Sequence, residues 1–144
     1  MNGLDIMREI ASGRATPPPI GELIGMRLIE VKPGEALFTL NVDRRHANPM
    51  GTLHGGILCD LGDAAMGCAV ATTLDEGQTY TTVELKVNFF KPVWNQQLRA
   101  TGKVVKRTRK LAYAEAEVHD EAGSLVAKLS CSCLVLSGPD AQDR

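Results

Sequence analysis

The stretch Asn-Pro-Met-Gly-Thr-Leu-His-Gly-Gly-Ile-Leu-Cys-Asp-Leu-Gly-Asp, residues 48–63, decides the fold and carries the candidate chemistry. It places a His-Gly-Gly turn at the start of an apolar helix and puts Asp63 about two turns inside that helix. Two glycines at a helix start expose backbone N–H groups that can bind a partial negative charge. A carboxylate on an apolar helix is costly unless it is paired or used. The stretch therefore combines a group that can hold an electrophile with a nucleophile or base.

One long helix is predicted from Gly55 to about Thr73, because apolar residues recur there at spacings of three and four. Glycine and alanine keep this helix thin, so it can pack very close to a sheet. Prolines, glycines and polar turns separate the shorter elements around it. We predict helices at residues 3–12 and 20–25, a hairpin of strands 28–32 and 35–42, a polar loop at 43–53, and strands at 79–90, 98–106, 111–120 and 124–136.

The predicted order is two strands, one helix and four strands in a meander, with antiparallel neighbours. This is a two-layer α+β domain in which a curved antiparallel sheet wraps around a long central helix. We assign residues 1–19 to an N-terminal helix and a Pro-rich connector that forbids helix before Ile20, residues 20–136 to the domain, and residues 137–144 to a polar tail. Alternation predicts a shared face for Val83, Leu85, Val87 and Phe89, and another for Ala112, Ala114, Ala116 and Val118.

Composition excludes several classes of protein. A length of 144 residues with 44% hydrophobic and 23% charged residues is typical of one globular domain, and a net charge of −1 argues against nucleic-acid binding through bulk charge. The first residues lack the pattern of a signal peptide, and no apolar run reaches the length of a membrane span. We therefore expect a cytoplasmic protein without a nucleic-acid or membrane partner. The four cysteines and three histidines lack ligand spacing, so we expect free thiols, no metal and no cofactor.

These motifs resemble the hotdog-fold acyl-CoA thioesterases of the PaaI-like, phenylacetate-pathway branch. The resemblance covers residues 20–136 and implies the hotdog fold, thioester hydrolase activity on an aryl- or medium-chain acyl-CoA, and a homodimer with two interface sites, commonly doubled to a homotetramer. Thr108 departs from the branch, which often has glycine in this basic turn. The motifs are Asn48-Pro49-x-Gly51-x-x-His54-Gly55-Gly56, Asp63-x-Ala65-x-Gly67, Thr82-Val83-Glu84-Leu85-Lys86-Val87-Asn88-Phe89, Pro92-Val93 and residues 104–112.

The spacing of Gly55 and Asp63 constrains any joint mechanism. The two residues are eight positions apart, which is about 12 Å along one helix. Attack requires the reacting atoms to lie within about 3.5 Å. If both groups act on one carbonyl, Asp63 must therefore come from a second subunit, as in a two-fold dimer with the two helices side by side and antiparallel.

The resemblance also implies roles for individual residues. The Gly55 N–H would stabilise the oxyanion, Asn48 would orient the carbonyl or a water, and His54 would brace the loop. Asp63 would attack or deprotonate a water, and both roles stay open; Thr82 would hold that water or the carboxylate. Gly56 belongs to the substrate-binding helix start. The basic turn, defined as Lys106, Arg107, Arg109 and Lys110, would bind the coenzyme A phosphates. Candidates for the acyl pocket wall are Met50, Phe89, Phe90 and Trp94.

Simpler interpretations stand beside these roles. Asp63 could be a structural acid at a dimer seam, Asp60 is the rival acid nearer the helix start, and the basic turn could be a solvated hairpin tip. A non-catalytic acyl-CoA-binding or regulatory protein of the same fold is the alternative function. A hydratase or dehydratase of this fold, which needs an Asp/His pair across the cleft, is a third.

Overall fold

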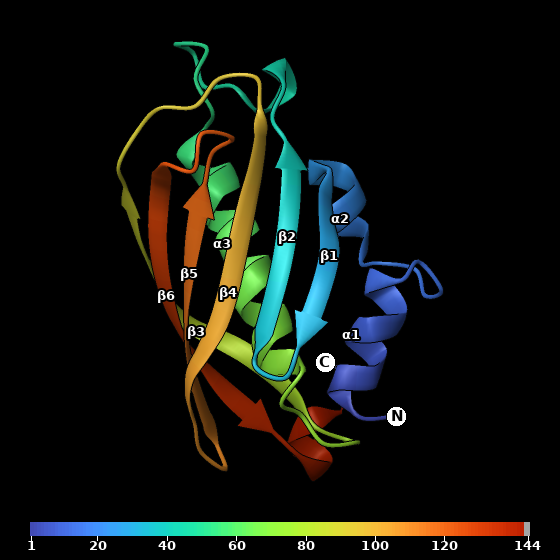
Figure 1. Cartoon of the computed structure of the whole chain (residues 1–144). Helices are drawn as coiled ribbons and strands as arrows, with labels where there is room; N and C mark the ends of the chain where they lie inside the picture. The colour runs from blue at the N-terminus through green and yellow to red at the C-terminus, as the bar shows by residue number, and fades with distance from the viewer. Residues whose placement is uncertain (143–144) are drawn as a thin grey trace.

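The computed structural model describes residues 1–142 and contains one six-stranded antiparallel sheet packed against one long helix (Figure 1). The expected two-layer α+β architecture is thus confirmed. Short 3₁₀ turns lie at Arg44–His46 and Gly138–Ala141. The helices are α1 (Gly3–Ala11), α2 (Pro19–Ile24) and α3 (Gly55–Ala71), and the strands are β1 (Met26–Lys32), β2 (Glu35–Asn41), β3 (Thr79–Phe89), β4 (Gln97–Arg107), β5 (Leu111–His119) and β6 (Leu125–Leu136).

The strand order is β1-β2-β4-β5-β6-β3, so the predicted four-strand meander is wrong for β3. Only β4, β5 and β6 form a meander, whereas β3 pairs with β6 at the sheet edge. The connection from β3 to β4 spans residues 90–96 and crosses the β5–β6 turn. Lys91 Nζ lies 2.6 Å from Asp120 Oδ2, and the Gln97 N–H donates to Glu121 Oε1 at 2.8 Å. These contacts hold the β3–β4 connection against the β5–β6 turn. The order of the strands along the sequence does not predict this crossing.

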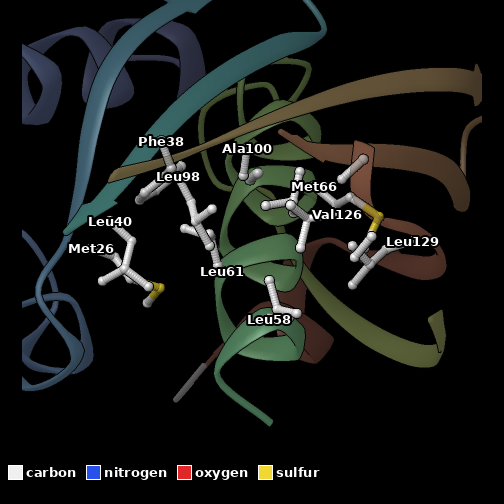
Figure 2. Packing of buried hydrophobic residues seen from close by; sticks show 14 of the residues in the cluster. Met26, Phe38, Leu40, Leu58, Leu61, Met66, Leu98, Ala100, Val126 and Leu129 are labelled. Carbon is white, nitrogen blue, oxygen red and sulfur yellow. The ribbon is translucent and has the colours of Figure 1, made fainter. Parts of the chain in front are cut away.

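Helix α3 lies directly on the sheet. Its buried side chains Leu58, Leu61 and Met66 point toward β-strand residues such as Leu98 and Val126 (Figure 2). The four predicted alternating residues of β5, 112 to 118, are all buried in the same core. The close packing expected of a thin helix is therefore confirmed.

Strand β3 departs from strict alternation. Its pairing with β6 shifts register between Thr82 and Glu84, which is a β-bulge. Leu85 and Val87 pack against the core, but Val83 is 56% exposed. The predicted common face is therefore wrong for Val83, because the bulge interrupts the two-residue period before Leu85.

Several boundaries differ slightly from the prediction. Helix α2 begins at Pro19 although the proline run was expected to forbid helix before Ile20; the first helical position tolerates proline because its N–H has no helical partner. Helix α3 ends at Ala71 rather than Thr73. The last two positions of the predicted tail lie outside the described residues. Within residues 1–142, no helix has the length and apolar character needed to cross a membrane.

Candidate active site

The start of α3 leaves one backbone donor free. The His54 side chain caps the helix, since its Nδ1 accepts a hydrogen bond from the Gly56 N–H at 2.9 Å. Within residues 1–142, the Gly55 N–H has no hydrogen-bond acceptor. A Cβ atom on Gly55 would lie 2.9 Å from Cζ of Phe89, so a larger residue here would require this exposed ring to move. The helix start can therefore offer the Gly55 N–H to an oxygen of a bound molecule.

The loop before α3 uses Asn48 to hold its own shape. The Asn48 Nδ2 donates to Thr52 Oγ1 at 2.7 Å, and its Oδ1 accepts from the Met50 N–H at 3.0 Å. Both ends of the amide are thus occupied within the loop. Asn48 would have to exchange one of these partners to contact a substrate directly.

His46 anchors the same loop from inside the protein, and the sequence reasoning did not single it out. Its buried Nδ1 accepts from the Asp43 N–H at 3.0 Å, so Nε2 carries the proton that it donates to the Ile24 carbonyl at 2.7 Å. The His54 N–H donates to the His46 carbonyl at 2.9 Å. The Asp43-x-x-His46 spacing is that of a capping box, which is the signal that could have identified this residue.

Asp63 is half-buried on α3 and faces the edge strand β3. Its Oδ1 accepts a hydrogen bond from Thr82 Oγ1 at 3.3 Å. Burial raises the pKa of the Asp63 carboxyl, the Thr82 hydrogen bond lowers it, and the nearby negative charge of Asp60 raises it again, with a net upward shift. Thr82 Oγ1 also lies 3.6 Å from the Sγ of Cys133, which, like the other three cysteines, is a free thiol. The structure thus brings Asp63 and Thr82 together, and of the two expected partners of Thr82, a water or the carboxylate, it shows contact with the carboxylate.

One chain does not bring Gly55 and Asp63 together. Both lie on α3, and eight residues of helical rise separate them by about 12 Å. The rival acid Asp60 is exposed, whereas Asp63 is half-buried and paired. Within one chain the carboxylate and the free N–H are therefore too far apart to act on the same carbonyl.

The basic turn lies between β4 and β5, beyond the opposite end of α3 from Gly55 (Figure 1). Its Arg107 is held within the protein, because Nε donates to Thr73 Oγ1 at 3.1 Å just after α3 ends. The other three members, Lys106, Arg109 and Lys110, are exposed. The turn therefore presents free positive charge to solvent at that end of the domain.

A cavity of about 660 Å³ lies between the N-terminal segment, β1 and α3. Its lining includes Ala64 and Cys68 of α3 and Tyr80 of β3. The residues expected to form the acyl wall lie outside this cavity. None of the expected wall residues lines it, and all four are more than half exposed: Met50, Phe89, Phe90 and Trp94.

Comparison with known proteins identifies the family. A family model described as the thioesterase superfamily matches residues 50–127. Acyl-coenzyme A thioesterase 13 from Homo sapiens is 25% identical over 125 residues, which cover 85% of this chain and 89% of that protein. A thioesterase family protein from Silicibacter pomeroyi has a similar structure with a TM-score of 0.83 and 27% identity, covering 92% of this chain and 99% of that one.

The fold is shared with the E. coli PaaI protein from the phenylacetic acid degradation operon. That structure gives a TM-score of 0.84 at 20% identity, covering 94% of this chain and 96% of that one. The expected family is confirmed by the match over more than half of the sequence. The chain belongs to the thioesterase superfamily, as a hotdog-fold thioester hydrolase.

Proposed function

We propose that this protein hydrolyses an aryl- or medium-chain acyl-CoA at a site shared by two subunits. Asp63 of one subunit acts on a thioester carbonyl that the Gly55 N–H of the other subunit holds. The observation that carries the proposal is the pair of half-sites on α3: a free N–H at its start and a half-buried carboxylate about 12 Å further along. The first can stabilise a negative charge but has no base or nucleophile, and the second is a base or nucleophile without a donor for the carbonyl oxygen.

The position of β3 supports the dimer. This eleven-residue strand lies at the sheet edge and carries Thr82, the partner of Asp63. An exposed edge strand offers a row of unpaired backbone groups to a second chain. If two copies pair antiparallel through β3, their α3 helices lie side by side and antiparallel, which brings each Asp63 toward the helix start of the partner. Two such dimers would form the expected tetramer.

The chemistry follows from these two groups. The Gly55 N–H stabilises the negative charge that develops on the carbonyl oxygen, and the loss of one such donor typically costs about 100- to 1000-fold in rate. Asp63 takes a proton from water, or attacks the carbonyl itself, and the C–S bond then breaks to release the free acid and the thiol of coenzyme A. The raised pKa of Asp63 suits a base, because a more basic carboxylate accepts the proton more readily.

The remaining predicted residues complete the site. His54 and Asn48 hold the loop before α3 in shape, and Gly56 completes the substrate-binding helix start through its hydrogen bond to His54. The basic turn binds the phosphates of coenzyme A by charge-assisted hydrogen bonds. Such contacts bind substrate and transition state equally, so they act on KM rather than on kcat.

Thiol release from a panel of acyl-CoA substrates tests the proposal. We expect Asp63→Asn to keep the melting temperature and the Thr82 contact while kcat falls about 100- to 10,000-fold. Asp60→Asn is the matched control, one helical turn away, and should keep most of the activity. Wild-type activity in Asp63→Asn, or no turnover of any thioester by the wild-type protein, would refute the proposal.

The pH dependence gives a second test. Because the pKa of Asp63 in the folded protein is raised above the ordinary value of 3.8, its basic form is lost on acidification earlier than that of an exposed aspartate. The acidic limb of kcat/KM should therefore lie above pH 3.8. An acidic limb below that pH would contradict the assignment of Asp63 as the base.

A further inference from the structure

We propose that the cavity between α3 and the N-terminal segment, residues 7–21, receives the acyl group, so that this segment sets the length of the substrate. The proposal rests on the function proposed above and names its specificity-determining element. The family model matches residues 50–127, so the N-terminal segment lies outside the matched region. Substrate length would then be set by a part of the chain separate from the residues that carry the chemistry.

The cavity has the size and chemistry for an apolar ligand. Its volume of about 660 Å³ lies within the range of about 300–1,000 Å³ typical of small-molecule pockets. No acidic residue among positions 1–142 lines it. Of its two cationic residues, Arg14 is exposed and hydrogen-bonded to Glu9 at 2.9 Å, and Arg27 is exposed. Apolar side chains from both sides fill most of the wall: Met7, Ile10, Ile20, Met26, Leu28 and Phe38.

Two residues that line the cavity are close neighbours in sequence of Asp63 and Thr82. Ala64, which lines it, directly follows Asp63, and Tyr80 lies two residues before Thr82 on β3. A Cβ on Gly67 would lie 3.2 Å from Cζ of Tyr80 and closer still to its hydroxyl, so the glycine leaves room for this ring against the helix. An acyl chain whose carbonyl lies at Asp63 can therefore enter past Ala64 and Tyr80 toward α1.

The far wall is held in place. The Gly3 N–H of α1 donates to the Leu74 carbonyl just after α3, at 3.0 Å, and a side chain on Gly3 would collide with the Ala71 carbonyl. The N-terminal ammonium group pairs with Glu76 at 3.3 Å. Because α1 is docked on the end of α3, its side chains Met7 and Ile10 form a defined end to the cavity.

Substitution at Ile10 tests the proposal on a ladder of straight-chain acyl-CoA substrates from butyryl to dodecanoyl. Burial of one methylene is worth about fourfold in kcat/KM. If the tryptophan of Ile10→Trp fills the space of about three methylenes, the ratio of kcat/KM for decanoyl-CoA to kcat/KM for butyryl-CoA should fall about 60-fold. Ile10→Ala should shift the preference toward longer chains. Ile6→Trp is the matched control, because Ile6 lies on α1, is 41% exposed and does not line the cavity; it should keep the wild-type profile.

Binding separates this proposal from the proposed hydrolysis. Calorimetric titration of the Asp63→Asn variant should show tighter binding of decanoyl-CoA than of butyryl-CoA, the same order as in turnover. Adding Ile10→Trp to this variant should abolish the preference for decanoyl-CoA. Unchanged chain-length profiles in both Ile10 variants, by turnover or by titration, would overturn the acyl-pocket assignment while leaving hydrolysis intact. Absence of turnover in the wild-type protein would refute the hydrolysis alone, since the titration still decides the pocket.

Discussion

Replacing Gly102 by alanine should destabilise the protein by about 2 kcal/mol, because this residue of β4 faces the backbone of α3. A Cβ at position 102 would lie 2.7 Å from the Met66 nitrogen and closer still to the Ala65 carbonyl. Ordinary contact with the Met66 nitrogen requires about 3.4 Å, so the helix would have to move away by at least about 0.7 Å. Main-chain atoms cannot rotate aside as a side chain does.

The magnitude follows from two opposing contributions. Forcing an extra methyl group into a packed interior costs about 1–3 kcal/mol, and the upper end applies because the obstructing atoms are backbone. The alanine substitution also adds about 0.5–1 kcal/mol of folding stability, because glycine loses more conformational freedom on folding than alanine does. The difference leaves about 2 kcal/mol of net destabilisation.

Urea unfolding followed by circular dichroism at one fixed protein concentration measures this difference. Gly62→Ala is the matched comparison, because its obstacle is the flexible side chain of Leu129, whose Cδ1 would lie 2.7 Å from the new Cβ. Alanine also favours the helix at position 62 by about 1 kcal/mol. We expect Gly62→Ala to cost about 1 kcal/mol or less. If Gly102→Ala is no more destabilising than Gly62→Ala, backbone contact with β4 does not position α3.

Two further predictions concern charged groups. Lys91, at 2.6 Å, holds the pKa of the Asp120 carboxyl below 3.8, so this pair adds stability above the unfolded-state pKa and loses it as pH falls through the folded-state pKa. The difference in unfolding free energy between the wild-type protein and Asp120→Asn should be largest near pH 7 and shrink below about pH 4; a difference independent of pH would contradict it. Arg109→Ala and Lys110→Ala should each raise KM for acyl-CoA without lowering kcat, and added salt should raise the wild-type KM in the same way. Equal KM values in all three proteins would exclude these side chains from phosphate binding.

Local sequence signals predicted the helix better than the order of the strands. Helix α3 could be predicted from residue spacing and from the glycines at its start, because both signals lie within the segment itself. The pairing of β3 with β6 depends on contacts that adjacency in sequence does not encode, such as Lys91 with Asp120. Seven connecting residues reach about 23 Å, enough to cross three strand spacings of about 5 Å each.

The site was predictable to a similar extent. Asp63 and Thr82 belong to two of the quoted motifs, and the structure places the Thr82 hydroxyl 3.3 Å from the Asp63 carboxylate. The cavity could not be predicted, because its walls come from residues as far apart in sequence as Met7 and Tyr80, which only the tertiary structure brings together. The large apolar residues singled out near the helix start, such as Trp94, are exposed instead.

The separation of the two groups along α3 has a physical reason. The field of a helix stabilises negative charge in its first turn, which suits the oxyanion held by Gly55 but would lower the pKa of a carboxylate placed there. Asp63 lies beyond that turn, where burial raises its pKa and so strengthens it as a base. One helix can therefore provide both an anion-stabilising N–H and a basic carboxylate only if it keeps them apart. In the proposed mechanism neither half-site is therefore sufficient alone, and a second subunit would bring the basic carboxylate to the helix start.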